Sequence, residues 1–135
     1  MLLSDDRAPS DLGLSVRLRA DHGEVDQGGG VVWRALDPSN YYICRYNPLE
    51  DNFRVYKVEQ GKRTELASAD VARRAGWRQV RVSMNADMIK CFLDGQKLLE
   101  VHDRTFPGPG KIGLWSKADA QTTFDDFELK SGGLD

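Results

Sequence analysis

The stretch GGGVVWRALDPSNYYICRYNPLEDNFRVYKVEQGKRTEL, residues 28–66, decides the fold. Apolar and polar residues alternate along it with the period of two that a half-buried β-strand has, and turn-forming residues interrupt the alternation. Asp37-Pro38-Ser39-Asn40 places Asp at the first and Pro at the second position of a type I turn. Gln60-Gly61 marks a further hairpin. The stretch therefore predicts three or four consecutive antiparallel strands.

The same alternation recurs about every ten residues through the rest of the chain, which is typical of a sandwich or barrel. Asp94-Gly95 supplies the positive φ of a tight hairpin, whereas residues 69–77 allow one helical turn at most. We expect strands at 12–20, 30–36, 41–47, 53–59, 62–68, 77–84, 88–94, 96–102, 110–117 and 121–130. The predicted fold class is all-β, with two antiparallel sheets packed face to face.

Length and charge limit the classes of function. The 135 residues predict one domain, with 1–11 and 131–135 as flexible or edge segments. A net charge of −2, with basic residues scattered among acidic ones, argues against a nucleic-acid partner. The chain has no run of about twenty apolar residues, so the sequence predicts no membrane-spanning segment. The start, MLLSDDRAPSD, is no signal peptide, so either the protein stays inside the cell or an export signal lies outside this sequence.

The two cysteines lie inside apolar strand patterns, YYICRY for Cys44 and MIKCFL for Cys91. Buried free thiols are the plain expectation for such positions. A disulfide between them is the alternative, which depends on a distance that the sequence does not contain.

The side chains of the strands at 30–36, 41–47 and 53–59 separate onto two faces once these strands are paired. Leu36 is expected to pair with Tyr41 across the DPSN turn, and Tyr46 with Phe53 across the NPLEDN loop. The predicted core face then holds Val31, Trp33, Ala35, Tyr42, Cys44, Tyr46, Phe53 and Val55. A one-residue slip would expose Phe53 and bury Arg54, which the cost of burying a charge disfavours.

The opposite face carries arginines and tyrosines in place of solubilising lysines and glutamates. Its predicted members are Arg34, Arg45, Arg54, Tyr41 and Tyr56. Arg45 and Arg54 become cross-strand neighbours, which is unfavourable unless something acidic lies among them. The candidates are Glu50, Asp51, Asp119, Asp126 or a bound ligand. This face is therefore either a salt-bridged surface or a ligand groove.

Three long segments carry a family resemblance: residues 31–66, GWRQVRVSMNADMIKCFLDGQKLLEVHDRTF at 76–106 and GKIGLWSKADAQTTFDDFEL at 110–129. Together they resemble small bacterial proteins of the concanavalin A-like lectin/glucanase superfamily, in particular the group that includes the 3-keto-disaccharide hydrolase domain. The resemblance implies a jelly roll of two curved sheets, with sugars bound on the concave one. It also implies an exported protein.

Members of this family commonly have additional N-terminal strands, which this chain is expected to lack. The last strand, TTFDDFELK, would then pair with MLLSD or remain an open edge. An open edge would make a homodimer plausible.

Sugar binding requires an aromatic ring to cover the C–H face of the sugar and planar polar groups to hold its hydroxyls. The candidate platforms are Tyr41, Tyr56 and Trp115, the candidate donors are Arg34, Arg45, Asn47, Arg54 and Lys117, and the candidate acceptor is Asp119. Trp115 has an alternative role, which is to close the core between the sheets.

No catalytic constellation is identified. Retaining glycosidases of this fold deliver their carboxylates from a Glu-x-Asp-x-x-Glu strand. Glu24-Val25-Asp26 is the nearest match and lacks the third acid. A structural calcium ion, with Asp125 and Asp126 as candidate ligands, fits no known loop motif, and the isolated His22 and His102 predict no zinc site.

We therefore expect a carbohydrate-binding, lectin-like β-sandwich without a cofactor. One alternative is a glycoside-processing hydrolase of the 3-keto-disaccharide type. The other is a structural module that dimerises through an exposed edge strand.

Overall fold

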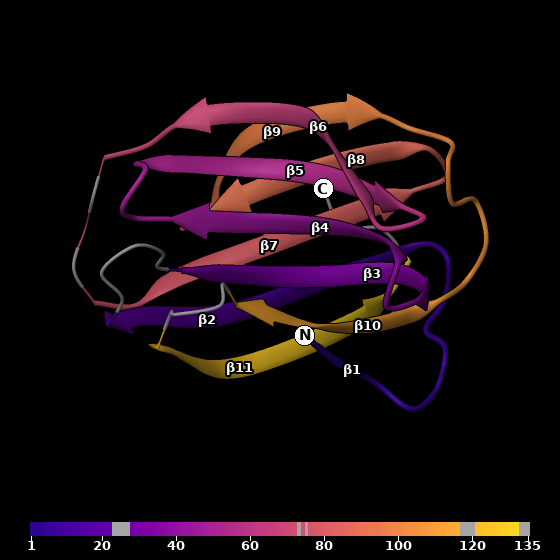
Figure 1. The fold of residues 1–135 in the computed structure, drawn as a ribbon, viewed down its shortest axis with the longest axis horizontal. Helices are drawn as coiled ribbons and strands as arrows, with labels where there is room; N and C mark the ends of the chain where they lie inside the picture. Colours follow the sequence, from indigo (N-terminus) through magenta and orange to yellow (C-terminus); the bar gives the residue numbers. More distant parts are fainter. Residues whose placement is uncertain (23–27, 73, 75, 117–120, 133–135) are drawn as a thin grey trace.

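Two antiparallel β-sheets lie face to face in the computed structural model, which describes residues 1–22, 28–72, 74, 76–116 and 121–132 (Figure 1). The strands are β1 (Leu2–Leu3), β2 (Leu12–His22), β3 (Gly29–Asp37), β4 (Asn40–Asn47), β5 (Asn52–Glu59), β6 (Lys62–Asp70), β7 (Arg78–Asn85), β8 (Met88–Leu93), β9 (Gln96–His102), β10 (Lys111–Ser116) and β11 (Gln121–Ser131). The ten predicted strands are confirmed, and β1 is an addition. None of the described residues forms a helix of the length and apolarity needed to cross a membrane.

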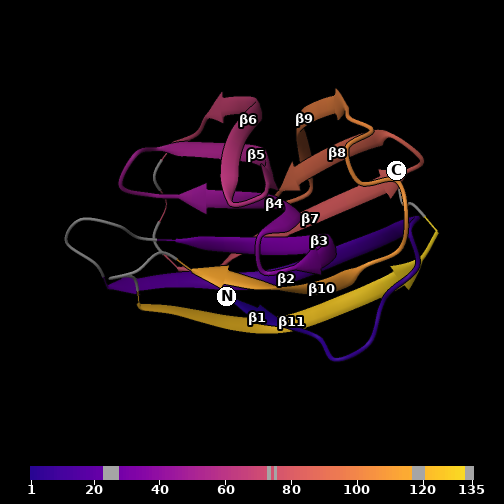
Figure 2. The same cartoon turned by 45° about the vertical axis from the view of Figure 1, so that its right-hand side comes forward.

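The strand order is β1-β10-β3-β4-β5-β6 in the six-stranded sheet and β11-β2-β7-β8-β9 in the five-stranded sheet. In both views the edges β6 and β9 lie at the top of the molecule, and β1 and β11 lie at the bottom (Figures 1 and 2). Leu2–Leu3 pairs with β10, so the expected pairing of MLLSD with the last strand is wrong. The alternative is confirmed, because β11 is an edge strand that pairs with β2.

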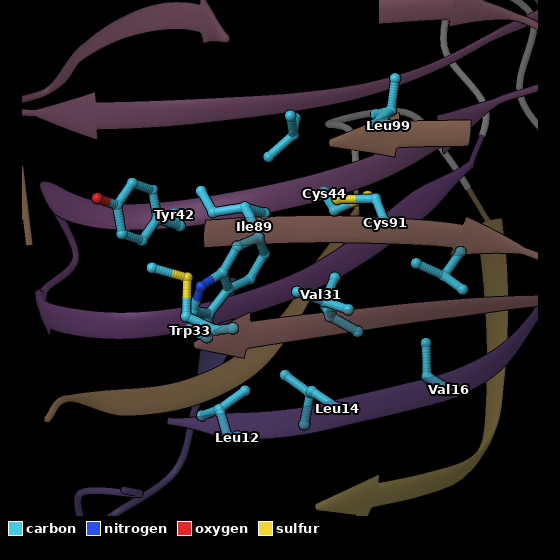
Figure 3. Close-up of a cluster of buried hydrophobic side chains, with 14 of the residues drawn as sticks. Leu12, Leu14, Val16, Val31, Trp33, Tyr42, Cys44, Ile89, Cys91 and Leu99 are labelled. Carbon is cyan, nitrogen blue, oxygen red and sulfur yellow. The ribbon is translucent and has the colours of Figure 1, made fainter. Parts of the chain in front are cut away.

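The core is the layer of side chains between the two sheets (Figure 3). Trp33 of β3 has no exposed surface and stacks on Tyr42 of β4, with 5.6 Å between ring centroids. The alternate residues Leu12, Leu14 and Val16 of β2 fill the layer from the opposite sheet. The period of two thus produces the predicted core face, because successive strand residues point to opposite sides of the sheet.

The two cysteines face each other across this layer, Cys44 from β4 and Cys91 from β8 (Figure 3). Both are free and buried, as expected. Burial raises the pKa of the Cys44 thiol well above its ordinary value, so the thiol is protonated at neutral pH.

The register between β3 and β4 corrects one part of the prediction. Asp37 pairs with Asn40 at the turn, but an irregularity follows, and Trp33 pairs with Tyr42, two residues away from the expected register. Arg34 has a φ of 48° inside this bulge. The shift of two residues preserves the faces of Val31 to Trp33, whereas the bulge itself reverses the faces of Arg34 and Ala35. Ala35 therefore belongs to the opposite face of the sheet rather than to the core.

Candidate functional site

The outer face, the side of the six-stranded sheet that points away from the five-stranded sheet, carries a second buried cluster. Its members are Val32, Ala35, Tyr41, Ile43, Tyr56 and Val58, with Leu3 and Trp115 packed against them. Long charged side chains lie over this cluster, since the guanidinium groups of Arg45 and Arg63 lie 5.3 Å and 4.7 Å from the ring centroid of Tyr56. The outer face is thus a layer of apolar side chains under a layer of arginines.

Arg45 is the most buried charged group of this layer, with 2% of its surface exposed. Its Nη2 donates a 2.9 Å hydrogen bond to the hydroxyl oxygen of Tyr56 and lies 3.5 Å from Oε2 of Glu50. Its Nε and Nη1 are buried and find no acceptor within the described part of the chain. Because an unpaired buried donor costs free energy, these two nitrogens call for a water molecule or a ligand.

Arg54 lies directly opposite Arg45 on β5, as predicted. It donates to the hydroxyl of Ser68 at 3.0 Å and to that of Tyr56 at 3.4 Å, and the hydrogen bond to Tyr56 raises the pKa of Arg54. Its carboxylate partner is Glu65 on β6, at 3.2 Å. The two neighbouring arginines are therefore compatible because each has its own glutamate.

Of these two acids, Glu50 was predicted from the sequence, whereas Glu65 was not. The signal was present, because continuing the pairing across the Gln60-Gly61 turn places Glu65 opposite Tyr56, as observed. Two other candidate acids are not part of this layer. Asp126 pairs with Arg17 on the other sheet, and Asp119 lies outside the described residues.

Two aromatic rings flank the arginines. Tyr41 is 9% exposed, and burial raises the pKa of its hydroxyl. Trp115 is partly buried against the outer cluster rather than in the layer between the sheets. Gly30 pairs with Trp115 on one side and with Arg45 on the other, so a position without a side chain separates the indole from the guanidinium.

The backbone requires glycine at that position. A Cβ atom at Gly30 would lie 1.9 Å from the carbonyl oxygen of Cys44. No side chain of β3 therefore stands between Trp115 and Arg45.

Arg34 is not part of the outer face, which corrects its prediction as a ligand-binding donor. It is 1% exposed, and its Nε and Nη1 donate to the carbonyl oxygens of Ser10 at 2.9 Å and Phe106 at 2.8 Å. Burial lowers the pKa of Arg34, while the carboxylate of Asp11, 3.4 Å from its Nη2, acts in the opposite direction. The bulge turned this side chain inward, where it ties three segments of the fold together.

Asn47 acts on the site through the backbone. It is 1% exposed, and its side-chain oxygen accepts hydrogen bonds from the N–H groups of Leu49 and Glu50 at 3.0 Å and 3.2 Å. These bonds shape the loop that presents Glu50 to Arg45. Lys117, the remaining predicted donor, lies outside the described residues.

The weak calcium candidates lie on β11, in the other sheet. Asp126 forms the ion pair with Arg17 at 3.1 Å, and its N–H donates to the carboxylate of Asp125 at 2.8 Å. Within the described ranges, no group of three or more His, Cys, Asp or Glu side chains is arranged to hold a metal ion.

Comparison with known proteins identifies the fold. No family model and no curated protein sequence matches the chain. Its structure is similar to the carbohydrate-binding module CBM66 from Bacillus subtilis, with a TM-score of 0.87 and 21% identity over 96% of this chain and 80% of that one. It is also similar to a Bacillus subtilis protein of unknown function with a galectin-like fold, with a TM-score of 0.78 and 12% identity over 96% and 76% of the two chains.

Sheep galectin-11 in complex with glycerol has a TM-score of 0.71 and 6% identity, over 96% of each chain. At such low identities the likeness establishes the fold alone. The chain has a two-sheet antiparallel sandwich like that of these structures, which confirms the predicted fold class.

Proposed function

We propose that this chain is a carbohydrate-binding, lectin-like module that holds a sugar on the outer face. The observation that carries the proposal is the side chain of Arg45, a residue that is 2% exposed and whose Nε and Nη1 have no acceptor among the described residues. The fold supports the proposal, because the similar structures include a carbohydrate-binding module and a galectin.

The groups around Arg45 match the chemistry of a sugar. The planar guanidinium groups of Arg45 and Arg54 would donate hydrogen bonds to two neighbouring hydroxyl oxygens of the sugar. The carboxylate of Glu50 would accept a hydrogen bond from a sugar hydroxyl. The indole of Trp115 offers an apolar surface to the C–H face of the ring. Trp115 and Arg45 are two strands apart, about 10 Å between Cα atoms, and Gly30 places no side chain between them, so a sugar ring could lie against both.

Isothermal titration calorimetry with glycans selected on an array tests this proposal. Arg45→Ala should weaken binding about tenfold or more, because it removes charge-assisted hydrogen bonds. Arg54→Ala is the companion variant, since its side chain is 33% exposed and its loss is tolerated more easily by the fold. Lys97→Ala, on an edge strand of the other sheet, is the control and should bind as the wild type does.

The result that would reject the proposal is equally clear. If folded Arg45→Ala and Arg54→Ala variants bind the same glycan as tightly as the wild type, the outer face is not the binding surface. If no glycan on the array is retained by the wild type, the module is not a lectin.

We propose, as a second property, that two copies associate through β11. Phe127 and Leu129 on this open edge are 37% and 41% exposed, and Leu2 on the neighbouring edge is 71% exposed. An apolar hollow lies between the two edges, lined by Leu2, Leu3, Ser4, Asp5, Ile112, Gly113, Leu114 and Phe127. An unpaired strand with apolar side chains beside it favours pairing with another copy.

Sedimentation equilibrium over a range of concentrations tests the dimer. The wild type should show a monomer–dimer equilibrium, and Phe127→Glu should shift it to the monomer. A wild type that remains monomeric at its highest soluble concentration would contradict this proposal without affecting the first.

A further inference from the structure

The outer side of the five-stranded sheet carries a basic strip along its three central strands. The residues that face away from the core are Gly13, Ser15, Arg17 and Arg19 on β2, Gln79, Arg81 and Ser83 on β7, and Lys90 and Phe92 on β8. No acidic residue occurs in 13–19, 78–85 or 88–93. Beyond the strip, β2 continues through Asp21 to His22, and the edge strands carry acids such as Glu128 on β11 and Glu100 on β9. We define the basic strip as the residues of 13–19, 78–85 and 88–93 that face away from the core.

A hollow of about 130 Å³ opens at one end of the basic strip. Gly13 and Ser15 line it, and these two small residues leave space that larger residues would fill. Leu14 also lines it, together with the longer side chains of Gln79, Arg81, Glu128 and Lys130. Two cationic groups and one carboxylate therefore surround the hollow.

Arg81 is held in place by an aromatic ring rather than by a carboxylate. Its guanidinium carbon lies 4.0 Å from the ring centroid of Phe92, which is 6% exposed. No ion pair to Arg81 is found within the described part of the chain. A cation–π contact orients the guanidinium without neutralising its charge, so it remains able to bind an anion.

An indole lies at the other end of the basic strip. The guanidinium carbons of Arg17 and Arg19 lie 5.0 Å and 5.1 Å from the ring centroid of Trp77, which is partly exposed. Arg17 also pairs with Asp126 at the edge of the sheet. Trp77 is four residues from Arg81, about 13 Å along the strand, so a chain of two or more sugar units could contact both ends.

We propose that the basic strip binds an acidic polysaccharide. A carboxylate of the polymer would occupy the hollow beside Arg81 and Lys130, and a sugar ring further along would lie against Trp77. The strip is three strands wide, about 10 Å, with Asp126 and Glu128 on one flanking strand and Glu100 on the other. A single polysaccharide chain fits between those edges, whereas the broader double helix of DNA would meet the acids. This site is separate from the outer face and does not depend on the function proposed for it.

Affinity electrophoresis and calorimetry with polygalacturonate, a polymer of uronic acid, test the proposal. Arg81→Glu should weaken binding about tenfold or more, because it replaces an attractive charge by a repulsive one at the hollow. Trp77→Ala should also weaken binding. Glu128→Gln should strengthen binding, since it removes the carboxylate of the hollow. Added salt should weaken binding of the wild type, as expected for a charged polymer.

The controls separate this site from the general charge of the protein and from the outer face. Lys62→Glu, a matched charge reversal at an exposed position of β6, should bind polygalacturonate as the wild type does. Arg45→Ala should also bind it as the wild type does. Fully methyl-esterified polygalacturonate, which has lost its charges, should not bind.

Three results would overturn the proposal. One is equal binding of the esterified and the acidic polymer, and another is wild-type affinity in a folded Arg81→Glu variant. The third is binding of a DNA or RNA oligonucleotide as tight as that of polygalacturonate, because the strip would then attract any polyanion.

Discussion

Nη2 of Arg45 donates a 2.9 Å hydrogen bond to the hydroxyl oxygen of Tyr56, and both groups are almost completely buried on the outer face. The bond joins β4 to β5 at the position where Arg54 also donates to Tyr56. One hydroxyl therefore organises two neighbouring guanidinium groups.

Replacing Tyr56 with Phe removes that acceptor and leaves another buried N–H group of Arg45 unpaired. We expect Tyr56→Phe to lower the free energy of unfolding by about 1–3 kcal/mol, measured by urea denaturation. Tyr41→Phe is the matched control, since no hydrogen bond from the Tyr41 hydroxyl is found among the described residues, and it should change stability less. Equal effects of the two changes would contradict the role given to Tyr56.

Trp33→Ala should destabilise the protein by about 3–5 kcal/mol, because a fully buried ring leaves a cavity between the sheets. Thermal and urea denaturation measure this loss. Trp115→Ala provides the comparison and should cost less, since Trp115 is only partly buried. A loss below about 1 kcal/mol for Trp33→Ala would mean that the assignment of the core face is wrong.

Arg34→Met should lower the free energy of unfolding by about 1.5–3 kcal/mol, because the carbonyl oxygens of Ser10 and Phe106 lose a charged donor. Glycan affinity of the folded variant should remain that of the wild type, since Arg34 is not on the outer face. If the Arg34→Met variant has normal stability but loses glycan affinity, Arg34 belongs to the binding site.

Gly30→Ala should destabilise the protein by about 1–3 kcal/mol, because the added Cβ would overlap the carbonyl oxygen of Cys44. Gly108→Ala is the matched control, since no atom lies within 4 Å of the Cβ it would add. Urea denaturation of the two variants should separate them. Equal stability would show that β3 can move away from β4 at this point.

The lowered pKa of the Asp87 carboxyl predicts that its contribution to the free energy of unfolding depends on pH in the acid range. Hydrogen bonds from Arg104 and His102 lower the pKa of its carboxyl from 3.8 to about 2. A lowered pKa means that the folded state holds the ionised form more firmly than the unfolded state does. Its contribution is therefore complete above pH 3.8 and is lost as the pH falls toward 2.

The stability difference between the wild type and Asp87→Asn should accordingly shrink as the pH falls through this window. Urea denaturation at several pH values, together with an NMR titration of the Asp87 carboxyl, measures it. A carboxyl that titrates at its ordinary value, with a pH-independent difference in stability, would contradict the interaction with Arg104 and His102.

Local patterns in the sequence were sufficient for the strands and for most of the core. Alternation with a period of two assigned Trp33 and Tyr42 to the interior, because neighbouring side chains of a strand must point to opposite faces. The pairing of Tyr46 with Phe53 combined the same pattern with the NPLEDN loop, since a slip by one residue would expose Phe53 and bury Arg54. Most of the predicted outer face, including Arg45, Arg54 and Tyr56, depended on these two inferences and is confirmed in its placement.

Only the tertiary structure decided where Arg34 points and which strands become neighbours. A single positive φ in the bulge reverses the faces of Arg34 and Ala35, and no alternation of residue types reveals it. The pairing of β10 with β3, of β1 with β10 and of β11 with β2 joins segments far apart in the chain. Alternation specifies which face of a strand is apolar, whereas the choice of neighbour depends on how all the faces pack together.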